Sequence, residues 1–482
     1  MNWWCRVLLM GLMLPGTVIA TDKPNIIMIM CDDLGYGDTG FNGNKIIKTP
    51  ALDSMAEAGV VMTHFYAGGP VCSPTRATCL TGRHYYRMGI FSANVGHLPE
   101  EEVTIPEMLK EQGYTTGHFG KWHLGTLSPT LSSKGVRRKI KENFSPPGVH
   151  GYDRSFVVES AVATWDPGEG KRAKDNPFYE DGKLTTKNLK GGAGRVVMDR
   201  VIPFIEKAVD SNKPFLAVIW FNAPHEDILA GPDYLKMYEG YGKSAHFYGC
   251  ITEMDEQVGR LQAKLKELGV YENTVQFFAS DNGPEGSPPR KGCRRAGSAG
   301  PFSGRKRDLY EGGVRVPALV MWPGVIKSGN VVNIPISTLD YLPTIGNLTG
   351  APLPNVPLDG VDMMPIIKGE LQRRDKAIPF RYGRMAALVQ GNYKLIINAS
   401  DSAEQDVLYD LSSDVAETNN IRSAHPEMAH EMRKSLLTFL KNAKKSHAGA
   451  DYGISNYTPV DQFRSLKRNS NTAIKPRNNV KK

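Results

Sequence analysis

The segment PVCSPTRATCLTGR, residues 70–83, contains two cysteines seven positions apart. Cys72 could be half of a disulfide, a buried core residue, or a nucleophile. If the residues between them are helical, Cys72 and Cys79 are separated by seven rises of about 1.5 Å, which exceeds the ~7 Å limit for a disulfide. The spacing therefore argues against a bridge, whereas Cys79, next to Leu80, remains a candidate for the core.

The residues that follow Cys72 are typical of a helix start. Ser73 is a favourable N-cap, Pro74 suits the first helical position, and Gly82 suits the stop. Helix N-termini present unpaired N–H groups and partial positive charge, which bind anions and lower the pKa of a thiol. We therefore expect Cys72 at the entrance of a short helix, with a lowered thiol pKa.

Polar residues also follow three apolar, strand-like segments. These residues are Asp32 and Asp33, then His225, then Asp281 and Asn282. In open α/β sheets ligands bind beyond the carboxyl ends of the strands, so these side chains are expected to meet at one site. Carboxylate and amide oxygens suit Ca²⁺ or Mg²⁺ rather than zinc. From spacing alone, a metal site and a set of capped turns are equally good interpretations.

The elements that must position these residues can be read from the apolar pattern. Residues 25–33, 215–225, 275–283 and 316–324 are apolar, and amphipathic helical patterns separate them, as expected for buried parallel strands. After about residue 370 the pattern changes to alternating strands and one helix. The sequence predicts an α/β fold with a mixed, mostly parallel sheet flanked by helices, and a smaller C-terminal α+β domain built on an antiparallel sheet.

The N-terminus resembles a signal peptide. A charged start, the apolar run VLLMGLMLPGTVI and small residues Val18 and Ala20 fit cleavage after residue 20. The run is short for a membrane span and contains Pro15. We predict an exported protein without stable membrane insertion, in four parts: signal peptide 1–20, catalytic domain 21–370, C-terminal domain 371–445, and a basic, poorly ordered tail 446–482.

Positive charge is concentrated in two places. The net charge is +9, yet residues 290–307 and 464–482 each contain seven Lys or Arg and no acid, which leaves −5 for the remainder. This distribution argues against nucleic-acid binding and favours an anionic substrate or surface. Without Cys5 of the signal peptide, five cysteines remain, an odd number that suggests a special role for one of them.

Six short motifs occur along the chain, in the order DDLGYGD (32–38), CSPTRA with TGR (72–83), GKWHLG (120–125), APH (223–225), SDNG (280–283) and LYEGGVRVP (309–317). Together and in this order they resemble one family, the formylglycine-dependent type I sulfatases, and most of all its arylsulfatase A and N-acetylgalactosamine-6-sulfatase branch. The LYDLSSDVAETNNI segment, residues 408–421, is similar to the C-terminal element of that family. In the family a maturation enzyme oxidises the motif cysteine to formylglycine.

The resemblance implies an alkaline-phosphatase-like fold and hydrolysis of carbohydrate or aryl sulfates. Asp32, Asp33, Asp281 and Asn282 would bind Ca²⁺, or Mg²⁺, and the formylglycine from Cys72 would complete the ligand shell. One hydroxyl of the hydrated aldehyde would be deprotonated with help from Asp281 and attack sulfur. The second hydroxyl would then allow sulfate to be eliminated.

The resemblance also assigns the charged residues. Lys121, His225, Arg76 and Lys306 would neutralise the sulfate oxygens, and Lys306 or His225 would protonate the leaving oxygen. Arg76 would also fix the nucleophile. His123 would be the base for sulfate elimination. Without the motifs, the favoured interpretation of His123, Lys121 and Lys306 is a core histidine, a snorkelling lysine and a solvated charge.

Three departures from the family pattern bear on substrate preference. Thr75 stands where serine or alanine is more usual, Glu226 follows His225, and residues 302–305 replace a common Arg-Gly-Gly approach to the lysine. The basic loop around Lys306 suggests a polyanionic substrate such as a sulfated glycan. Two alternatives remain: a phosphonate or phosphate ester hydrolase of the same superfamily, and a non-catalytic binder of sulfated glycans.

Overall fold

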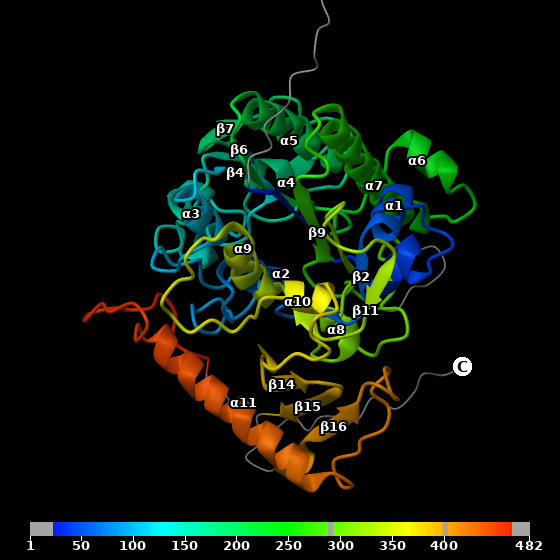
Figure 1. The fold of residues 1–482 in the computed structure, drawn as a ribbon. Coiled ribbons are helices and arrows are strands. Elements are labelled where there is room, and N and C mark those ends of the chain that lie inside the picture. Colours follow the sequence, from blue (N-terminus) through cyan, green and yellow to red (C-terminus); the bar gives the residue numbers. More distant parts are fainter. Residues whose placement is uncertain (1–22, 288–292, 399–402, 465–482) are drawn as a thin grey trace, which may run out of the picture.

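The computed structural model describes residues 23–287, 293–398 and 403–464 (Figure 1). The predicted signal peptide and residues 465–482 of the predicted tail lie outside these residues. Within them, no helix is long and apolar enough to cross a membrane.

A ten-stranded sheet forms the centre of the large domain, in the order β11-β2-β10-β9-β1-β8-β4-β5-β6-β7. The five strands from β9 to β5 are parallel, so the predicted mostly parallel sheet is confirmed. The strands are β1 (Asn25–Cys31), β2 (Val60–Met62), β4 (Thr115–Lys121), β5 (Arg154–Val158), β6 (Phe178–Glu180), β7 (Lys183–Thr185), β8 (Phe215–Trp220), β9 (Thr274–Ser280), β10 (Ala318–Met321) and β11 (Asn330–Val332).

The prediction of a parallel strand within residues 316–324 is wrong in direction. β10 runs antiparallel to β9, with Leu319 opposite Phe278. The chain between β9 and β10 contains only the short helix α8 (Glu311–Val314) among its described residues, and returns to the same end of the sheet. A strand buried on both faces has the same apolar pattern in either direction, so the sequence did not distinguish the two.

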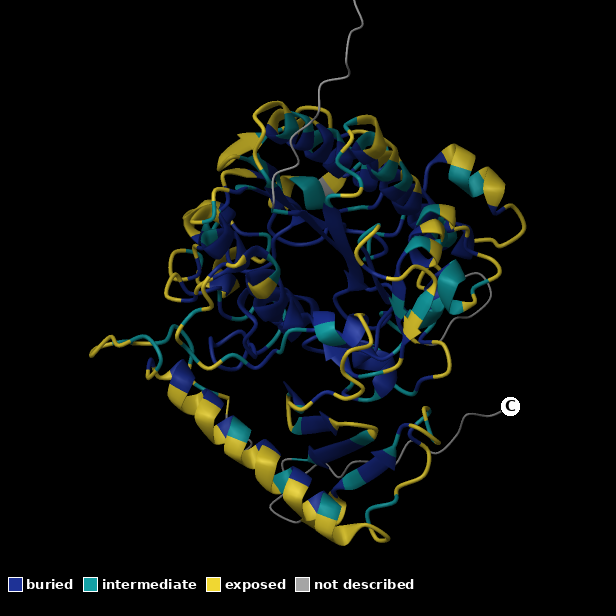
Figure 2. Ribbon diagram, in the orientation of Figure 1, coloured by how far each residue is buried: buried dark blue, intermediate teal, exposed yellow. Residues whose placement is uncertain are grey.

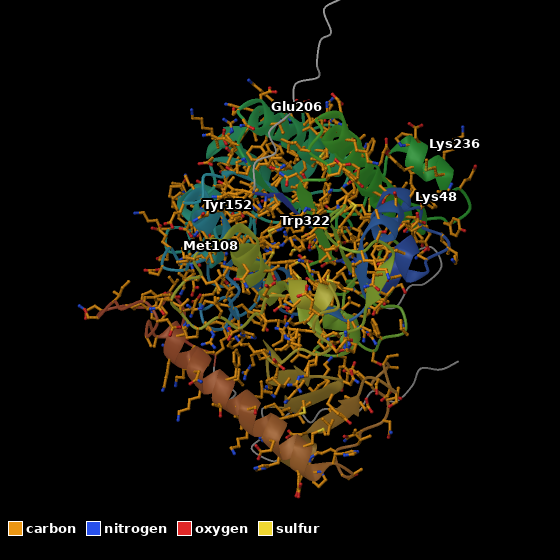
Figure 3. All side chains as sticks on the ribbon, viewed as in Figure 1. Lys48, Met108, Tyr152, Glu206, Lys236 and Trp322 are labelled. Atoms are coloured by element: carbon orange, nitrogen blue, oxygen red, sulfur yellow. The ribbon has the colours of Figure 1, made fainter. Side chains whose placement is uncertain are left out.

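Helices cover both faces of this sheet. Ile27 and Ile29 of β1 face a core that includes α1, α5 and α7, whereas Met28 and Met30 face a core that includes α2, α3 and α9. This alternation explains why the whole strand is apolar. The helices are α1 (Pro50–Ala58), α2 (Cys72–Thr81), α3 (Ile105–Lys110), α5 (Ala193–Asp210), α7 (Ser244–Glu267) and α9 (Tyr341–Thr349). Side chains fill the space between the layers (Figure 3).

Two buried carboxylates of α7 fix its neighbours. Glu253 accepts hydrogen bonds from the backbone of Arg195 at 2.8 Å, at the start of α5. Asp255 does the same for Ala51 and Leu52 at 2.9 and 2.8 Å, at the start of α1. The first N–H groups of a helix have no partner within it, so these carboxylates stabilise both helix starts.

The C-terminal domain is the predicted antiparallel sheet with one helix. One sheet face packs on α11, through Leu395 and Leu436, and the other packs on the large domain, through Phe380 and Tyr66. The outer side of α11 is exposed along its length (Figure 2). The elements are β13 (Ile378–Tyr382), β14 (Met385–Gln390), β15 (Tyr393–Asn398), β16 (Val407–Asp410) and α11 (Pro426–His447).

The remaining elements are short. They are β3 (Phe65–Tyr66) and β12 (Ile336–Ser337), which pair with each other, α4 (Gly170–Asp175), α6 (Pro232–Met237), α10 (Met364–Ile367), and the 3₁₀ turns Tyr36–Asp38, Gly40–Asn42, Gly135–Arg138, Pro147–His150, Thr338–Asp340 and Ala403–Gln405.

A buried group of charged and polar side chains connects the two domains. Lys394 of β15 lies between Glu311 and Glu417, with its Nζ 2.9 and 3.0 Å from their carboxylate oxygens. Glu311 also accepts from Tyr66 at 3.0 Å and pairs with Arg315 at 3.1 Å, and its own N–H donates to Glu417 at 2.6 Å. We call this the joining cluster: His64, Tyr66, Glu311, Arg315, Lys394 and Glu417.

The described part of the predicted tail touches the large domain through a few side chains. Phe463 packs edge-on against Phe91, with ring centroids 5.8 Å apart, and the Tyr452 hydroxyl donates to Glu102 at 2.7 Å. Asp451 forms an ion pair with Arg83. None of residues 450–464 is buried, so these contacts hold the segment at single points, and the poorly ordered tail stays a prediction.

Candidate active site

The ten residues singled out from the sequence lie together at the carboxyl ends of the parallel strands. Asp32 and Asp33 follow β1, and Asp281 and Asn282 follow β9. Lys121 is the last residue of β4, His123 lies two positions further, and His225 lies five residues after β8. Cys72 and Arg76 come from the first turns of α2, and Lys306 from the loop before α8.

The oxygen-bearing residues of this group leave three buried atoms without partners. Oδ1 of Asp32, Oδ2 of Asp33 and Oδ1 of Asn282 accept no hydrogen bond from any described residue. Single ligand atoms of Asp32, Cys72 and Asp281 lie within 4.8 Å of one another. Buried polar atoms are normally satisfied. The oxygens and their spacing therefore fit a hard divalent cation.

Each of the three carboxylates of the site also forms an ion pair with a lysine or an arginine. Lys121 Nζ lies 2.6 Å from Asp32, and Lys306 Nζ lies 2.5 Å from Asp33. Arg76 donates to Asp281 at 2.7 and 3.2 Å. We call these three acids and three bases the site cluster: Asp32, Asp33, Asp281, Arg76, Lys121 and Lys306.

Burial and charge act against each other in the site cluster. Burial alone would raise the pKa of Asp32, but Lys121 and the other cations hold that pKa well below its usual range. Burial and the charge of Asp32 raise the pKa of Asp281. Although burial opposes it, Asp33 raises the pKa of Lys306 and keeps this side chain cationic. The cluster therefore holds separated charges close to Cys72.

Cys72 differs in two respects from the prediction. Helix α2 begins at Cys72 itself, after the extended residue Val71, rather than after a Ser73 cap. Burial raises the pKa of the Cys72 thiol, although Lys121 and Lys306 oppose this shift. A helix terminus lowers the pKa of a thiol, but burial, which the local sequence does not show, outweighs that effect at Cys72. In the described part of the chain no cysteine is bridged, which agrees with the spacing argument for Cys72 and Cys79.

His123 is held as a neutral base. The backbone φ of His123 is +60°, and its backbone N–H donates to the backbone carbonyl of Glu159 at 3.0 Å. In the ring, Nε2 lies 3.0 Å from Oδ1 of Asn94. An amide oxygen only accepts, so Nε2 carries the proton and Nδ1 presents a lone pair. Nδ1 is buried and has no partner among the described residues. Burial, then the charges of Lys121 and Arg76, lower the pKa of His123 well below its usual value.

His225 lies at the outer side of the site. Its Nε2 is 3.8 Å from Asp33, and its Nδ1 is 2.7 Å from the carbonyl oxygen of Glu226. Since a carbonyl only accepts, Nδ1 carries a proton and Nε2 faces the site. Burial lowers the pKa of His225, although Asp32 and Asp33 oppose this shift.

Three neighbours of the site were not found from the sequence. Asn94 orients His123, Trp220 lies under the Arg76 guanidinium with 4.9 Å to its ring centroid, and Glu285 lies 3.6 Å from Lys306. Of the three, only Glu285 lies close in sequence to a motif, two residues after SDNG. Asn94 lies in a turn and Trp220 ends the buried strand β8, and nothing in either segment indicates a contact with the site.

The described part of the basic loop is largely engaged in internal contacts. Arg295 pairs with Glu226, Arg307 lies 2.7 Å from Glu285, and Arg305 donates to the carbonyl oxygen of Gly297 at 2.6 Å. Arg290 and Lys291 lie outside the described residues. This part of the loop therefore does not support the polyanion hypothesis.

The comparisons with known proteins agree with this geometry. A family model described as Sulfatase matches residues 24–351, and one described as N-sulphoglucosamine sulphohydrolase, C-terminal, matches residues 300–445. N-acetylgalactosamine-6-sulfatase of Canis lupus familiaris is 32% identical, over 81% of this chain and 75% of its own length. Arylsulfatase A of Homo sapiens is 32% identical, over 85% and 86%.

Solved structures share the fold. The crystal structure of Ps i-CgsB in complex with k-i-k-neocarrahexaose has a TM-score of 0.76 and 27% identity, and the match covers 88% of this chain and 94% of that one. Phosphonate monoester hydrolase of Agrobacterium radiobacter has a TM-score of 0.62 and 18% identity, over 87% and 96%.

The mixed sheet, its flanking helices and the site at the strand ends define an alkaline-phosphatase-like hydrolase, as the motifs implied. The chain belongs to the sulfatase family and is a sulfuric ester hydrolase.

Proposed function

We propose that this protein hydrolyses sulfate esters of carbohydrates, with a formylglycine made from Cys72 and a bound divalent cation, Ca²⁺ or Mg²⁺. The observation that carries the proposal is the convergence of Cys72 with Asp32 and Asp281, in a site where Oδ1 of Asp32, Oδ2 of Asp33 and Oδ1 of Asn282 are buried and accept no hydrogen bond. The preference for a carbohydrate over an aryl sulfate rests on the relatives, which include an N-acetylgalactosamine-6-sulfatase.

The side chains fit the two groups that the proposal requires. Asp32, Asp33, Asp281 and Asn282 would hold the cation, which would neutralise charge on the sulfate. The hydrated aldehyde would supply a nucleophile that can release sulfate again. A thiol whose pKa burial raises is a poor nucleophile at neutral pH, which agrees with a need to convert Cys72.

The remaining side chains of the site would handle charge and protons. Lys306 would donate a proton to the leaving oxygen, because it stays cationic beside Asp33. His225 is the second candidate for this donor, and it would donate from Nε2 only in its cationic form, because in the neutral ring the proton is on Nδ1 beside the Glu226 carbonyl oxygen. His123 would accept a proton at Nδ1 during release of sulfate.

Two residues would hold others in place. Arg76 is fully buried and its guanidinium is occupied by Asp281, so it would position that carboxylate and the start of α2 more than it would bind sulfate. Lys121 would hold Asp32 and extend its charge toward the sulfate oxygens.

The decisive test is the mass of the peptide that contains Cys72, from protein made with a formylglycine-generating enzyme, together with sulfate release from sulfated sugars. We expect an aldehyde mass and turnover, and loss of turnover in Cys72→Ala. Cys79→Ala, on the same helix and also buried, is the matched control and should keep turnover within a few-fold. An unmodified thiol in an active protein would reject the proposed nucleophile.

The same preparation separates the alternatives. Faster hydrolysis of a phosphonate ester than of the matching sulfate ester would favour the phosphonate hydrolase. A non-catalytic binder would retain sulfated glycans equally well in wild type and Cys72→Ala, without turnover.

The proposal includes export and domain limits. A signal peptide over residues 1–20 would be removed, and the catalytic domain would extend to residue 370, followed by a C-terminal domain to residue 445. N-terminal sequencing of the exported protein tests the first limit, and limited proteolysis tests the second.

A further inference from the structure

The outer face of α11 carries a row of cations to which no role has yet been given. From Met432 to His447 this helix contains five Lys or Arg residues and no acid. These five and His430 recur at intervals of three or four residues, so they lie along one side of the helix. We call this row, with the two neutral residues inside it, the helix stripe: His430, Arg433, Lys434, Leu437, Thr438, Lys441, Lys444 and Lys445.

The stripe takes no part in the packing of its own helix. α11 packs on the C-terminal sheet through the opposite side, which includes Ala429, Leu436 and Leu440. The first six residues of the stripe and Ala403 line a groove with a volume of about 450 Å³. From His430 to Lys445 the stripe is roughly 22 Å long at about 1.5 Å per residue. It is therefore a long, open surface rather than a pocket for one small molecule.

The first cations of the stripe have acids beside them. Arg433 forms an ion pair with Asp406 at 2.6 Å and is 15% exposed. Lys434 lies 3.7 Å from Glu431, but these two side chains are 67% and 65% exposed, and a pair so exposed contributes little. Arg433 is thus compensated, whereas Lys434 can exchange its partner for another anion.

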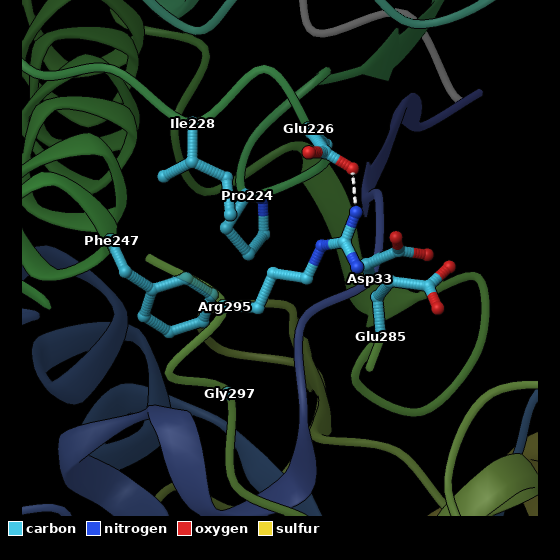
Figure 4. A pocket seen from close by; sticks show the side chains of 8 residues that line it. All are labelled: Asp33, Pro224, Glu226, Ile228, Phe247, Glu285, Arg295 and Gly297. Carbon is cyan, nitrogen blue, oxygen red and sulfur yellow. Dashed lines mark hydrogen bonds and ion pairs between the residues drawn. The ribbon is translucent and has the colours of Figure 1, made fainter. Parts of the chain in front are cut away.

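The later cations differ from those of the basic loop before α8. In that loop Arg295 lies against Glu226, as Figure 4 shows. Lys441, Lys444 and Lys445 form no ion pair with any described residue. Of the two basic regions that the structure describes, the loop is compensated internally and the end of α11 is open to an external anion.

Helix stability explains only the end of the stripe. Lys444 and Lys445 lie in the last turn of α11, where cations interact favourably with the helix dipole. Lys434 and Lys441 lie before that turn. Lys441 also has like charges three and four residues further on, and such pairs destabilise a helix. A bound polyanion would remove this repulsion.

The chemistry of the stripe fits a sulfated polysaccharide. A straight row of cations matches a linear polymer with repeated negative charge better than a single anion. Between the cations, the Thr438 hydroxyl and the 38% exposed Leu437 offer a hydrogen-bonding group and an apolar surface, which suit the hydroxyl groups and C–H faces of sugar rings. A helix that binds membranes needs a broader apolar face than one leucine.

We propose that the helix stripe is a second binding surface for a sulfated polysaccharide, which shares no residue with the site of hydrolysis. The choice of a sulfated sugar polymer rests on the proposed function, whereas the open basic surface does not. A polymer held on α11 would raise the effective concentration of its sulfate esters around the active site without taking part in the reaction.

The test measures binding of dextran sulfate, with dextran as the uncharged control, to the full chain with Cys72→Ala, so that no turnover intervenes. In Lys434→Gln/Lys441→Gln/Lys445→Gln we expect the Kd for dextran sulfate to rise at least about tenfold at low salt. The slope of log Kd against log salt should fall by about 2, as for three lost contacts to a flexible polyanion. The basic residues 464–482 are unchanged in every variant, so the difference reports α11.

Lys207→Gln/Lys213→Gln/Lys236→Gln is the matched control. These exposed lysines belong to or follow α5 and α6, on the far side of the large domain from α11 (Figure 1). Their loss removes the same charge and should leave binding of dextran sulfate unchanged. With Cys72 oxidised, both triple variants should hydrolyse 4-nitrophenyl sulfate at the wild-type rate, because neither changes the site.

Three results would overturn the inference: equal losses of binding in the two triple variants, equal binding of dextran and dextran sulfate, or full binding by the stripe variant. Tighter binding to phosphatidylserine vesicles than to dextran sulfate would also overturn it, in favour of a membrane surface. Binding as expected in a protein that turns over no sulfate ester would support the surface and contradict the proposed function instead.

Discussion

The site cluster and the joining cluster are both buried sets of acids and bases, yet they differ in one respect. In the joining cluster every carboxylate oxygen of Glu311 and Glu417 lies within 3.1 Å of a nitrogen or hydroxyl donor. In the site cluster Oδ1 of Asp32 and Oδ2 of Asp33 accept no hydrogen bond from the described residues, and the ion-pair partners of these two oxygens, Arg76 and His225, lie 3.9 and 3.8 Å away. The two clusters therefore differ in how closely their carboxylate oxygens are paired, not in the burial of charge.

The comparison has an energetic side. In a cluster whose buried charges are all closely paired, removal of one member is strongly destabilising, because the remaining charge is left buried without compensation. In a cluster whose carboxylate oxygens are not all closely paired, part of the favourable electrostatic free energy is gained only when a cation binds. The two clusters should therefore respond in opposite ways to substitution and to cations.

The largest effect is expected for Asp33→Asn. It removes a proposed cation ligand and the partner of Lys306, so kcat/KM on a sulfate ester should fall about 10³-fold. Without bound metal, Asp33→Asn should lower the free energy of unfolding by less than Lys394→Met does, because Lys306 still has Glu285 as a partner at 3.6 Å. Steady-state kinetics and denaturant unfolding measure the two. An Asp33→Asn protein that is strongly destabilised but fully active would contradict the distinction between the site cluster and the joining cluster.

Next in size is Lys394→Met. This change removes the cation between Glu311 and Glu417, and only Glu311 keeps Arg315 nearby, so the free energy of unfolding should fall by about 3–5 kcal/mol. Adding Glu311→Gln and Glu417→Gln should recover part of the loss. If the single and the triple variant unfold alike, the joining cluster is not a compensated charge set.

Cation removal should act on the site cluster alone. Ca²⁺ at about 100 times its Kd should stabilise the chelator-treated protein by about 2.7 kcal/mol, and Lys394→Met should show the same gain. Asp33→Asn should show little or none. An equal rise of Tm in Asp33→Asn would place the cation elsewhere.

The smallest effect concerns pH. Burial, with help from Arg315, lowers the pKa of His64 in the joining cluster to about 3. The neutral form is thus favoured in the folded state, and its contribution is present above the unfolded pKa of about 6.5 and is lost as pH falls. Between pH 6.5 and 5 the stability of wild type relative to His64→Gln should drop by about 1.6 kcal/mol. A constant difference would contradict the low pKa.

Sequence reasoning reached the site more easily than the joining cluster, for physical reasons. Asp32 and Asp281 end strongly apolar strands, and this local signal predicts their meeting at the sheet edge. Lys394 and Glu417 are 83 and 106 residues from Glu311, and their own segments contain nothing that predicts a buried pair.

Two further features were beyond local patterns. Glu253 and Asp255 lie within a long helix, where acids usually face solvent, and only the packed structure shows that they stabilise the starts of other helices. The direction of the Cys72 pKa shift depends on burial, which the helix-start pattern does not contain.

The anchoring of α2 has a consequence for the order of events during synthesis. Cys72 is 2% exposed, and the residues just after its helix are held by the last described part of the chain, through Arg83 with Asp451 and Tyr86 with Phe463. If Cys72 is oxidised as proposed, the enzyme that does so would have to reach it before these late contacts form. At about 5–20 residues per second, roughly 20–80 s pass between synthesis of residue 83 and residue 463. Once the chain has folded, Cys72 would no longer be accessible, so a chain that folds before oxidation would keep its thiol.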